Sequence, residues 1–168
     1  NGEIQWKKKI DNPILGEIKN IDIFGNNKYQ MIFNTASKLY LLDILGRNVS
    51  NFPANLSSKA NNGVSVMDYD NNQNFRFLIP SVNGIMSYSK SGKIVVGWAQ
   101  PTQVNSVLGD IKHIVINNLD YIIAQDKKGR LYFYNRKGEE RHSANATFGK
   151  IENVQNLCKK WRTIISIR

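Results

Sequence analysis

The residues with the clearest potential for chemistry lie between positions 68 and 72, where oxygen-bearing side chains alternate along the chain. Asp68, Asp70 and Asn72 could place three ligands around a calcium ion, which prefers carboxylate and amide oxygens. The loop lacks the glycine and the closing glutamate of an EF-hand, and Asp and Asn also bond to their own backbone in turns. We therefore predict a plain hairpin turn with no metal and no other cofactor, and keep these three residues as the ligand set of the metal alternative.

The chain has two histidines, and neither stands in a pattern that indicates catalysis. His113 belongs to a predicted strand and His142 to a polar strand end. No nucleophile and base can be paired with either of them from spacing. The Gly92-Lys93 pair lacks the upstream glycine of a phosphate-binding loop and falls between two predicted strands. We expect no catalytic residues, and therefore a protein that is not an enzyme.

The elements that would position such residues follow a repeat with a stride of 46 residues. The turn positions that recur at this stride are Gly46, Gly92 and Gly138, with Asp43, Ser89 and Asn135 opening the same turns. Two sets of aromatic positions, expected to pack between units, recur as Trp6, Phe52 and Trp98 and as Tyr29, Phe75 and Tyr121. A period in the mid-forties, made of short strands and turns, is typical of propeller blades. We expect the units to be in register without insertion.

Each unit is predicted to contain four short antiparallel strands, because apolar runs alternate with turn signals. The complete units span 18–52, 64–98 and 110–143 within a single propeller-type domain or fragment covering the whole chain. Residues 1–10 are expected to form the last strand of a preceding blade. Residues 148–168 are expected to form a partial blade, with a terminal helix as the alternative.

The inner strands of these units should be covered on both faces. Continuous apolar runs at 31–33, 77–79 and 121–123 predict this, since one blade cannot bury both faces alone. The predicted fold is all-β, a propeller-like array of three complete four-stranded antiparallel blades plus partial blades. A hairpin turn is predicted at Asn83-Gly84, because both residues tolerate positive φ.

The charge of the chain is strongly positive, at +10, with a pI of about 9.7. The basic residues are scattered through turns, which favours a solvated basic surface over a polyanion-binding face. A single cysteine, Cys158, excludes an intrachain disulfide framework, and no apolar run approaches the roughly 18 residues of a membrane span. Because the sequence starts at Asn1, we expect a fragment or processed form of a longer protein.

Several blocks of the sequence resemble known propeller repeats. Residues 41–47, residues 87–93 followed by Trp98, and residues 134–139 are similar to the outer-strand turn of quinoprotein-like and WD40-like propellers. Residues 66–77 resemble the propeller segment of uncharacterised secreted or envelope proteins of Bacteroidetes-type bacteria. This resemblance implies an extracytoplasmic location, periplasmic or in the cell envelope, and says little about activity, because propellers host many unrelated functions.

The sequence departs from the quinone-dependent enzymes of this kind at the turns. The threonine that usually precedes the turn glycine is replaced by Leu45, Ser91 and Lys137. Paired cysteines are impossible with one cysteine. These departures argue against a quinone-binding enzyme.

The leading functional hypothesis is a non-enzymatic interaction or scaffold module that binds a protein or a glycan through loops at one end of the array. The motivation is a regular repeat without a catalytic constellation. The alternatives are a degenerate quinoprotein-like enzyme domain and a polyanion- or glycan-binding module, the latter motivated by the charge. We expect self-association or a longer parent chain to cover the open ends of the array, and we do not expect nucleic acid as a partner.

Overall fold

The computed structural model describes residues 2–104 and 106–147, and of residues 143–147 only the backbone. These residues form eleven strands and no helix. All strand pairs are antiparallel, and they build three separate sheets. The expected all-β class is therefore confirmed. The partial blade or helix expected over 148–168 lies outside the described residues.

The first sheet follows the chain in sequential order, β1-β2-β3-β4. Its strands are β1 (Leu15–Ile21), β2 (Gln30–Asn34), β3 (Lys38–Leu42) and β4 (Ala54–Asn55). The fourth strand is only two residues long and lies beyond residue 52, where the predicted unit ends. The segment before it turns back, since Asn51 has a φ of 69° and Phe52 N donates to Val49 O.

The second sheet has three strands, so the expectation of four is wrong here. The strands are β5 (Ser65–Met67), β6 (Arg76–Ser81) and β7 (Gly84–Ser89), in that order. The segment 93–98 keeps only one bridge, between Tyr88 and Ile94. It then enters the same kind of turn as in the first unit, with Trp98 N donating to Val95 O and a φ of 79° at Gly97.

The third sheet restores four strands in sequential order. They are β8 (Lys112–Ile116), β9 (Leu119–Gln125), β10 (Arg130–Tyr134) and β11 (Glu140–Thr147). Asn117 and Asn118 connect β8 to β9 with positive φ at both residues, which matches the twist of a tight hairpin. At the predicted Asn83-Gly84 turn only Gly84 has positive φ.

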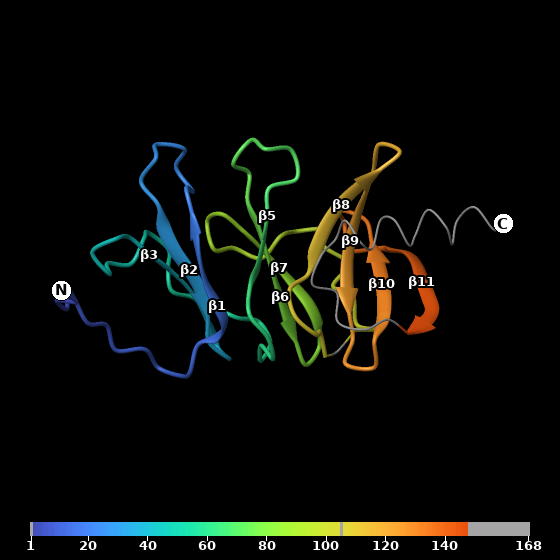
Figure 1. Cartoon of the computed structure of the whole chain (residues 1–168), viewed down its shortest axis with the longest axis horizontal. Helices are drawn as coiled ribbons and strands as arrows, with labels where there is room; N and C mark the ends of the chain where they lie inside the picture. The colour runs from blue at the N-terminus through green and yellow to red at the C-terminus, as the bar shows by residue number, and fades with distance from the viewer. Residues whose placement is uncertain (1, 105, 148–168) are drawn as a thin grey trace.

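The three sheets stack face to face along the chain, as Figure 1 shows from the sheet of β1, β2 and β3 on the left to the sheet ending in β11 on the right. One apolar cluster joins the inner faces of the first and second sheets, including Ile32, Leu41 and Phe77. Another joins the second and third sheets, including Leu78 and Ile122. Neighbouring residues of β6 thus point into different cores, so the run 77–79 is covered on both faces, as predicted.

Residues 2–10 do not form the expected strand. Their interactions come from side chains instead: Trp6 Nε1 donates to Ile44 O at 2.8 Å, and Lys8 Nζ donates to Gly46 O at 3.0 Å. A strand needs a neighbour with free backbone groups along its edge. The adjacent Asp43–Arg47 turn bonds to itself, so it offers isolated carbonyls and no such edge.

The third unit is out of step with the second by one residue. Phe77 pairs with Tyr88 in the second sheet, and Ile122 pairs with Tyr134 in the third. Tyr134 follows Tyr88 by the full stride, whereas Ile122 follows Phe77 by one residue less. The reason is that the β9–β10 connection at 126–130 has one residue more than the β6–β7 connection. The expectation of repeats without insertion is therefore wrong for this unit. A shift of one residue exchanges the two faces of a strand, and β8 and β9 are both reversed relative to β5 and β6.

Candidate functional site

The first strands of the three sheets lie beside one another. Gly16 and Gly63 meet so closely that a Cβ on Gly16 would lie 2.8 Å from the Gly63 Cα. Ser65 Oγ accepts a bond of 2.9 Å from Ile111 N, and Lys19 Nζ forms an ion pair of 2.7 Å with Asp110. The start of β1 thus contacts the second unit, and its centre contacts the third.

A pocket of about 300 Å³ opens between these strands, and we call it the first-strand pocket. It is lined by Lys19, residues 65–68 and residues 110–113. Both of its lysines face Asp110, Lys19 at 2.7 Å and Lys112 at 3.9 Å. The pocket's other carboxylate, Asp68, accepts hydrogen bonds from its own loop, so the lining contains two lysines and two aspartates, and both lysines lie beside Asp110.

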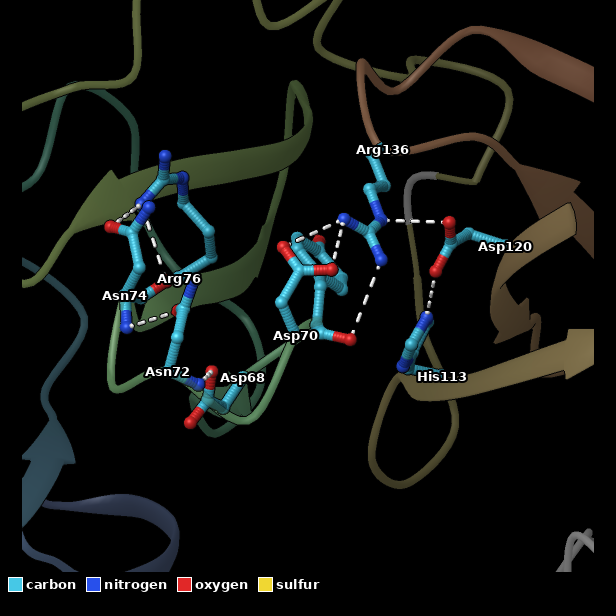
Figure 2. Close-up of polar contacts among 9 residues, drawn as sticks. Asp68, Asp70, Asn72, Asn74, Arg76, His113, Asp120 and Arg136 are labelled. Carbon is cyan, nitrogen blue, oxygen red and sulfur yellow. Dashed lines mark hydrogen bonds and ion pairs between the residues drawn. The ribbon is translucent and has the colours of Figure 1, made fainter. Parts of the chain in front are cut away.

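A chain of polar contacts, the ion pairs of Arg136 and a hydrogen bond between His113 and Asp120, lies between the second and third sheets, and we call it the ionic junction (Figure 2). His113 Nε2 lies 2.6 Å from Asp120 Oδ1, and Arg136 Nε lies 2.8 Å from Asp120 Oδ2. The same guanidinium reaches Asp70 at 2.7 Å. His113 comes from β8, Asp120 from β9, Arg136 from the β10–β11 turn and Asp70 from the β5–β6 loop.

The one-residue shift in the third sheet explains why these groups meet. His113 pairs with Ile122, whose side chain packs into the core shared with the second sheet. Paired residues of an antiparallel ladder share a face, so His113 and, two residues before Ile122, Asp120 also face the second sheet. If the third unit kept the stride of 46 residues, the residues next to His113 and Asp120 in the sequence would face the second sheet instead.

The ionic junction favours the ionised form of Asp120. Burial by itself disfavours the carboxylate, but hydrogen bonds from His113 and Arg136 and the guanidinium charge outweigh it, so the pKa of Asp120 is lowered. Tyr69 fills the space beside these groups, with Arg136 5.0 Å above its ring and His113 edge-on at 4.9 Å. Burial raises the pKa of Tyr69 far above its usual range, so the phenol stays protonated.

The structure does not bring the three metal-ligand candidates together (Figure 2). The Asp68 carboxylate accepts hydrogen bonds from Asn72 N and Gln73 N, and Asn72 Oδ1 accepts from Asn74 N. Asp70 points to Arg136. Each candidate oxygen faces donors of the protein. In the part of the chain that the structure describes, no cluster of three or more acidic, histidine or cysteine residues could hold a metal ion.

The same loop geometry occurs one stride earlier in the sequence. Asp22 accepts from Asn26 N and Asn27 N, and Asn26 Oδ1 accepts from Lys28 N. The two loops also touch, because the backbone of Gly25 lies against the Gln73 side chain. These oxygens therefore shape a repeated turn, and the loops that follow β1, β5 and β8 project at the same end of the array (Figure 1).

The three repeated turns have the same hydrogen bonds. In each, the opening residue donates to the carbonyl four positions on and accepts from the turn glycine, as in the turns opened by Asp43, Ser89 and Asn135. All three glycines have φ between 73° and 78°, and they are Gly46, Gly92 and Gly138. Only glycine adopts this region without strain.

An aromatic ring lies against each of these glycines, always from a residue 40 positions earlier. A Cβ at Gly46 would lie 2.6 Å from the Trp6 ring, and one at Gly138 would lie 3.0 Å from the Trp98 ring. At Gly92 the neighbour is Phe52, at 3.3 Å. The absence of a Cβ thus lets each ring approach the turn of the next unit.

In the second set of aromatic positions, Tyr29 and Phe75 lie on corresponding faces of their sheets, and Tyr121 does not. Phe75 packs against the core between the first and second sheets, whereas Tyr29 is 54% exposed on the outer face of the first sheet. Tyr121 packs with Ile123 and Phe133 on the face of the third sheet turned away from the second. The one-residue shift accounts for Tyr121.

Sequence reasoning missed Tyr69, Asp120 and Arg136 as members of the site. Arg136 and Asp70 are separated by 66 positions, so no local spacing joins them. His113 lies in a strand, as expected, and its side chain is mostly buried. Its counterpart one stride earlier, Met67, faces the next unit, whereas His113 faces the preceding one. The available signal was the longer basic turn at 126–130, whose extra residue reverses the faces.

Comparisons with known proteins add no assignment. No protein-family model matches the chain, and no curated protein matches it significantly. None of the residues that the structure describes forms a helix long and apolar enough to cross a membrane.

Proposed function

We propose that the chain is a non-enzymatic interaction module, built as a propeller-type array of β-sheet units, that binds a protein or glycan partner at the end carrying the β1–β2, β5–β6 and β8–β9 loops. The observation that carries the proposal is the approach of β1, β5 and β8 around the first-strand pocket. Strands that radiate from a common axis would bring their first members together in this way.

The contacts between units support the propeller-type arrangement. Gly16 meets Gly63, Ser65 binds the Ile111 amide, and Lys19 reaches Asp110 across the second unit. Sequential four-stranded meanders that stack through apolar faces are the usual content of such arrays. The resemblance to quinoprotein-like and WD40-like repeats points the same way.

The chemistry of the ionisable groups supports binding over turnover. His113, Asp120 and Arg136 are paired with one another, and Asp68 holds its own loop. A catalytic base needs a free face toward its substrate. These groups instead join two sheets and fix the loops beside the first-strand pocket.

The partner group that we expect at the first-strand pocket is acidic, because Lys19 and Lys112 share the carboxylate of Asp110, whereas the pocket's other carboxylate, Asp68, accepts hydrogen bonds from its own loop. A panel of neutral glycans, acidic glycans and acidic peptides tests this in a biosensor. We expect binding that Lys112→Ala weakens and that Lys128→Ala, in an exposed turn, leaves unchanged. The proposal would be contradicted by turnover of oligosaccharides, of esters, or of alcohols with added quinone. It would also be contradicted by binding whose affinity is the same in Lys112→Ala as in the unmodified chain.

A second candidate is binding of polyanions over a broad surface, which the net charge of +10 favours. This candidate differs from the loop-end site in its dependence on salt, since the affinity of a diffuse electrostatic contact falls steeply as the salt concentration rises. Retention on heparin that falls steeply with salt and is reduced equally by Lys112→Ala and Lys128→Ala would favour this candidate over the loop-end site.

A further inference from the structure

Asparagine precedes glycine at three places in the chain, and this pair of residues is chemically reactive. The asparagines are Asn1, Asn62 and Asn83, of which the first lies outside the described residues. The nitrogen of a following glycine can attack the side-chain carbonyl carbon of asparagine, because glycine has no Cβ to hinder the approach and adopts many backbone conformations. The structure places Asn62 and Asn83 in very different surroundings.

Asn62 is held by its side chain. Its Nδ2 donates to Val107 O at 3.0 Å and to Gly109 O at 2.9 Å, and its Oδ1 accepts from Gly63 N at 2.8 Å. These bonds join the connection before β5 to the connection before β8. The carboxamide is fixed in its orientation, so Asn62 needs a local opening of the two connections before it can react.

Asn83 lies in the turn between β6 and β7, and its carboxamide is free to rotate. The residue is exposed, and it forms hydrogen bonds through backbone atoms, since its N donates to Ser81 Oγ and its O accepts from Gln100 Nε2. Within the part of the chain that the structure describes, its side chain has no hydrogen-bond partner. Rotation of the side chain can therefore bring its carbonyl carbon to the Gly84 nitrogen.

We propose that Asn83 is a site of spontaneous deamidation, with water as the only co-reactant, and that the fold protects Asn62 from the same reaction. The Gly84 nitrogen forms a bond to Asn83 Cγ, and the bond between Cγ and Nδ2 breaks. The side-chain nitrogen leaves as ammonia with the proton of the Gly84 amide, and a succinimide ring remains. Water then opens the ring. Opening at Cγ gives aspartate, and opening at the backbone carbonyl gives isoaspartate.

The turn has little room for isoaspartate, because this product adds a carbon atom to the backbone. Ser81 Oγ donates to Gly84 O and accepts from Asn83 N. Gly84 packs so closely against the Pro101 carbonyl that a Cβ has no space, and Ile85 N donates to the same carbonyl at 3.0 Å. A longer backbone must separate some of these contacts. We expect the isoaspartate form to melt at a lower temperature than the unmodified chain.

The reactive turn lies at the end of the array opposite the β1–β2, β5–β6 and β8–β9 loops (Figure 1). The reaction needs only Asn83, Gly84 and water. This proposal therefore stands or fails independently of the partner that we propose for the other end.

Peptide mapping by mass spectrometry tests the proposal on the whole chain, incubated at neutral and at mildly alkaline pH. We expect the mass gain of deamidation at Asn83, and a faster gain at the higher pH because hydroxide removes the proton from the attacking nitrogen. Asn62 should react at least about tenfold more slowly, since its three hydrogen bonds must open first. Labelling by an isoaspartyl methyltransferase identifies the isoaspartate product.

Two variants and one change of solvent serve as controls. In urea that unfolds the chain, Asn62 and Asn83 should react at similar rates, because both precede glycine. Asn83→Gln should stop the reaction at this position, since the longer side chain would have to close a larger ring, and should leave the melting temperature unchanged. Asn83→Asp carries the charge of the product on an unaltered backbone, so it should melt above the isoaspartate form.

Four outcomes would overturn the proposal or one of its parts. Asn83 could stay unmodified in the folded chain while it reacts in the unfolded chain, or Asn62 and Asn83 could react equally fast in the folded chain. A difference between them that persists in urea would show that the fold does not protect Asn62. An isoaspartate form that melts no lower than Asn83→Asp would show that the turn accommodates the longer backbone.

Discussion

The two junctions between sheets are built on different principles. Between the first and second sheets the stride of 46 residues is kept, and the contact is an apolar core with Ile32, Leu41 and Phe77 fully buried. Between the second and third sheets, one extra residue at 126–130 turns His113 and Asp120 toward the second sheet, and ion pairs supplement a smaller apolar core. A single residue in a connection thus changes the chemistry of an interface without changing the strand order.

The largest expected effect is on the apolar junction. Phe77→Ala removes a fully buried ring between the first two sheets and should lower the free energy of unfolding by about 3–5 kcal/mol. Phe24→Ala, at a position 60% exposed, should change it by less than about 0.5 kcal/mol. Urea unfolding followed by circular dichroism measures both. Equal losses for the two variants would mean that the stacked core does not hold these sheets together.

The next prediction concerns the ionic junction. Arg136→Ala removes the guanidinium from Asp120 and Asp70 and should cost about 1–3 kcal/mol, because Asp120 is largely buried. The matched control is Arg47→Ala, whose ion pair with Asp43 is exposed and should be worth less than about 1 kcal/mol. Unfolding in urea gives both values. If Arg136→Ala lowers the free energy of unfolding no more than Arg47→Ala does, the ionic junction does not stabilise the contact between the two sheets.

A third prediction separates ring packing from backbone strain at the repeated turns. Gly138→Ala should cost more than the roughly 1–2 kcal/mol that a positive φ imposes, because the new Cβ would lie 3.0 Å from the Trp98 ring. Gly97→Ala carries the same strain at a φ of 79° but meets no atom within 4 Å. The difference between their melting temperatures isolates the ring contact. If Gly138→Ala lowered the melting temperature less than Gly97→Ala does, a contribution of the ring contact would be excluded.

The smallest expected effect is the pH dependence of the ionic junction. The pKa of Asp120 is lowered in the folded state, so its contribution to stability is complete above its ordinary value of 3.8 and is lost as the pH falls through the lowered pKa. Asp120→Asn should therefore flatten part of the decline in unfolding free energy below that value. Urea titrations at a series of acidic pH values measure it. An unchanged acid slope in the variant would show that Asp120 ionises equally in both states.

Local signals in the sequence predicted the turns well and the faces only in part. Turn chemistry at Asp43, Ser89 and Asn135 acts within five residues, and the three predicted turns form with the same hydrogen bonds. The fourth strands of the first two units were misplaced, since Asn51 and Gly97 open turns that interrupt them. The alternation of apolar residues in these two segments is compatible with a strand. Only the positive φ at Asn51 and Gly97 shows that the chain turns there.

The candidate site depended on information that spacing does not contain. Arg136 meets Asp70 and Asp120 through the packing of two sheets, and the extra residue before β10 decides which side chains face that contact. A count of residues in the β9–β10 connection could have revealed the reversal. The pairing itself is set by tertiary structure, which a local pattern cannot specify.

The contact between each repeated glycine and an aromatic ring has a consequence for biosynthesis. Trp98 precedes Gly138 by 40 residues, and Phe52 precedes Gly92 by the same distance. The ring has therefore always left the ribosome before the turn that it covers. Each newly made hairpin emerges after the aromatic residue that it contacts has been synthesised. The array can therefore fold from its beginning toward its end, one sheet at a time.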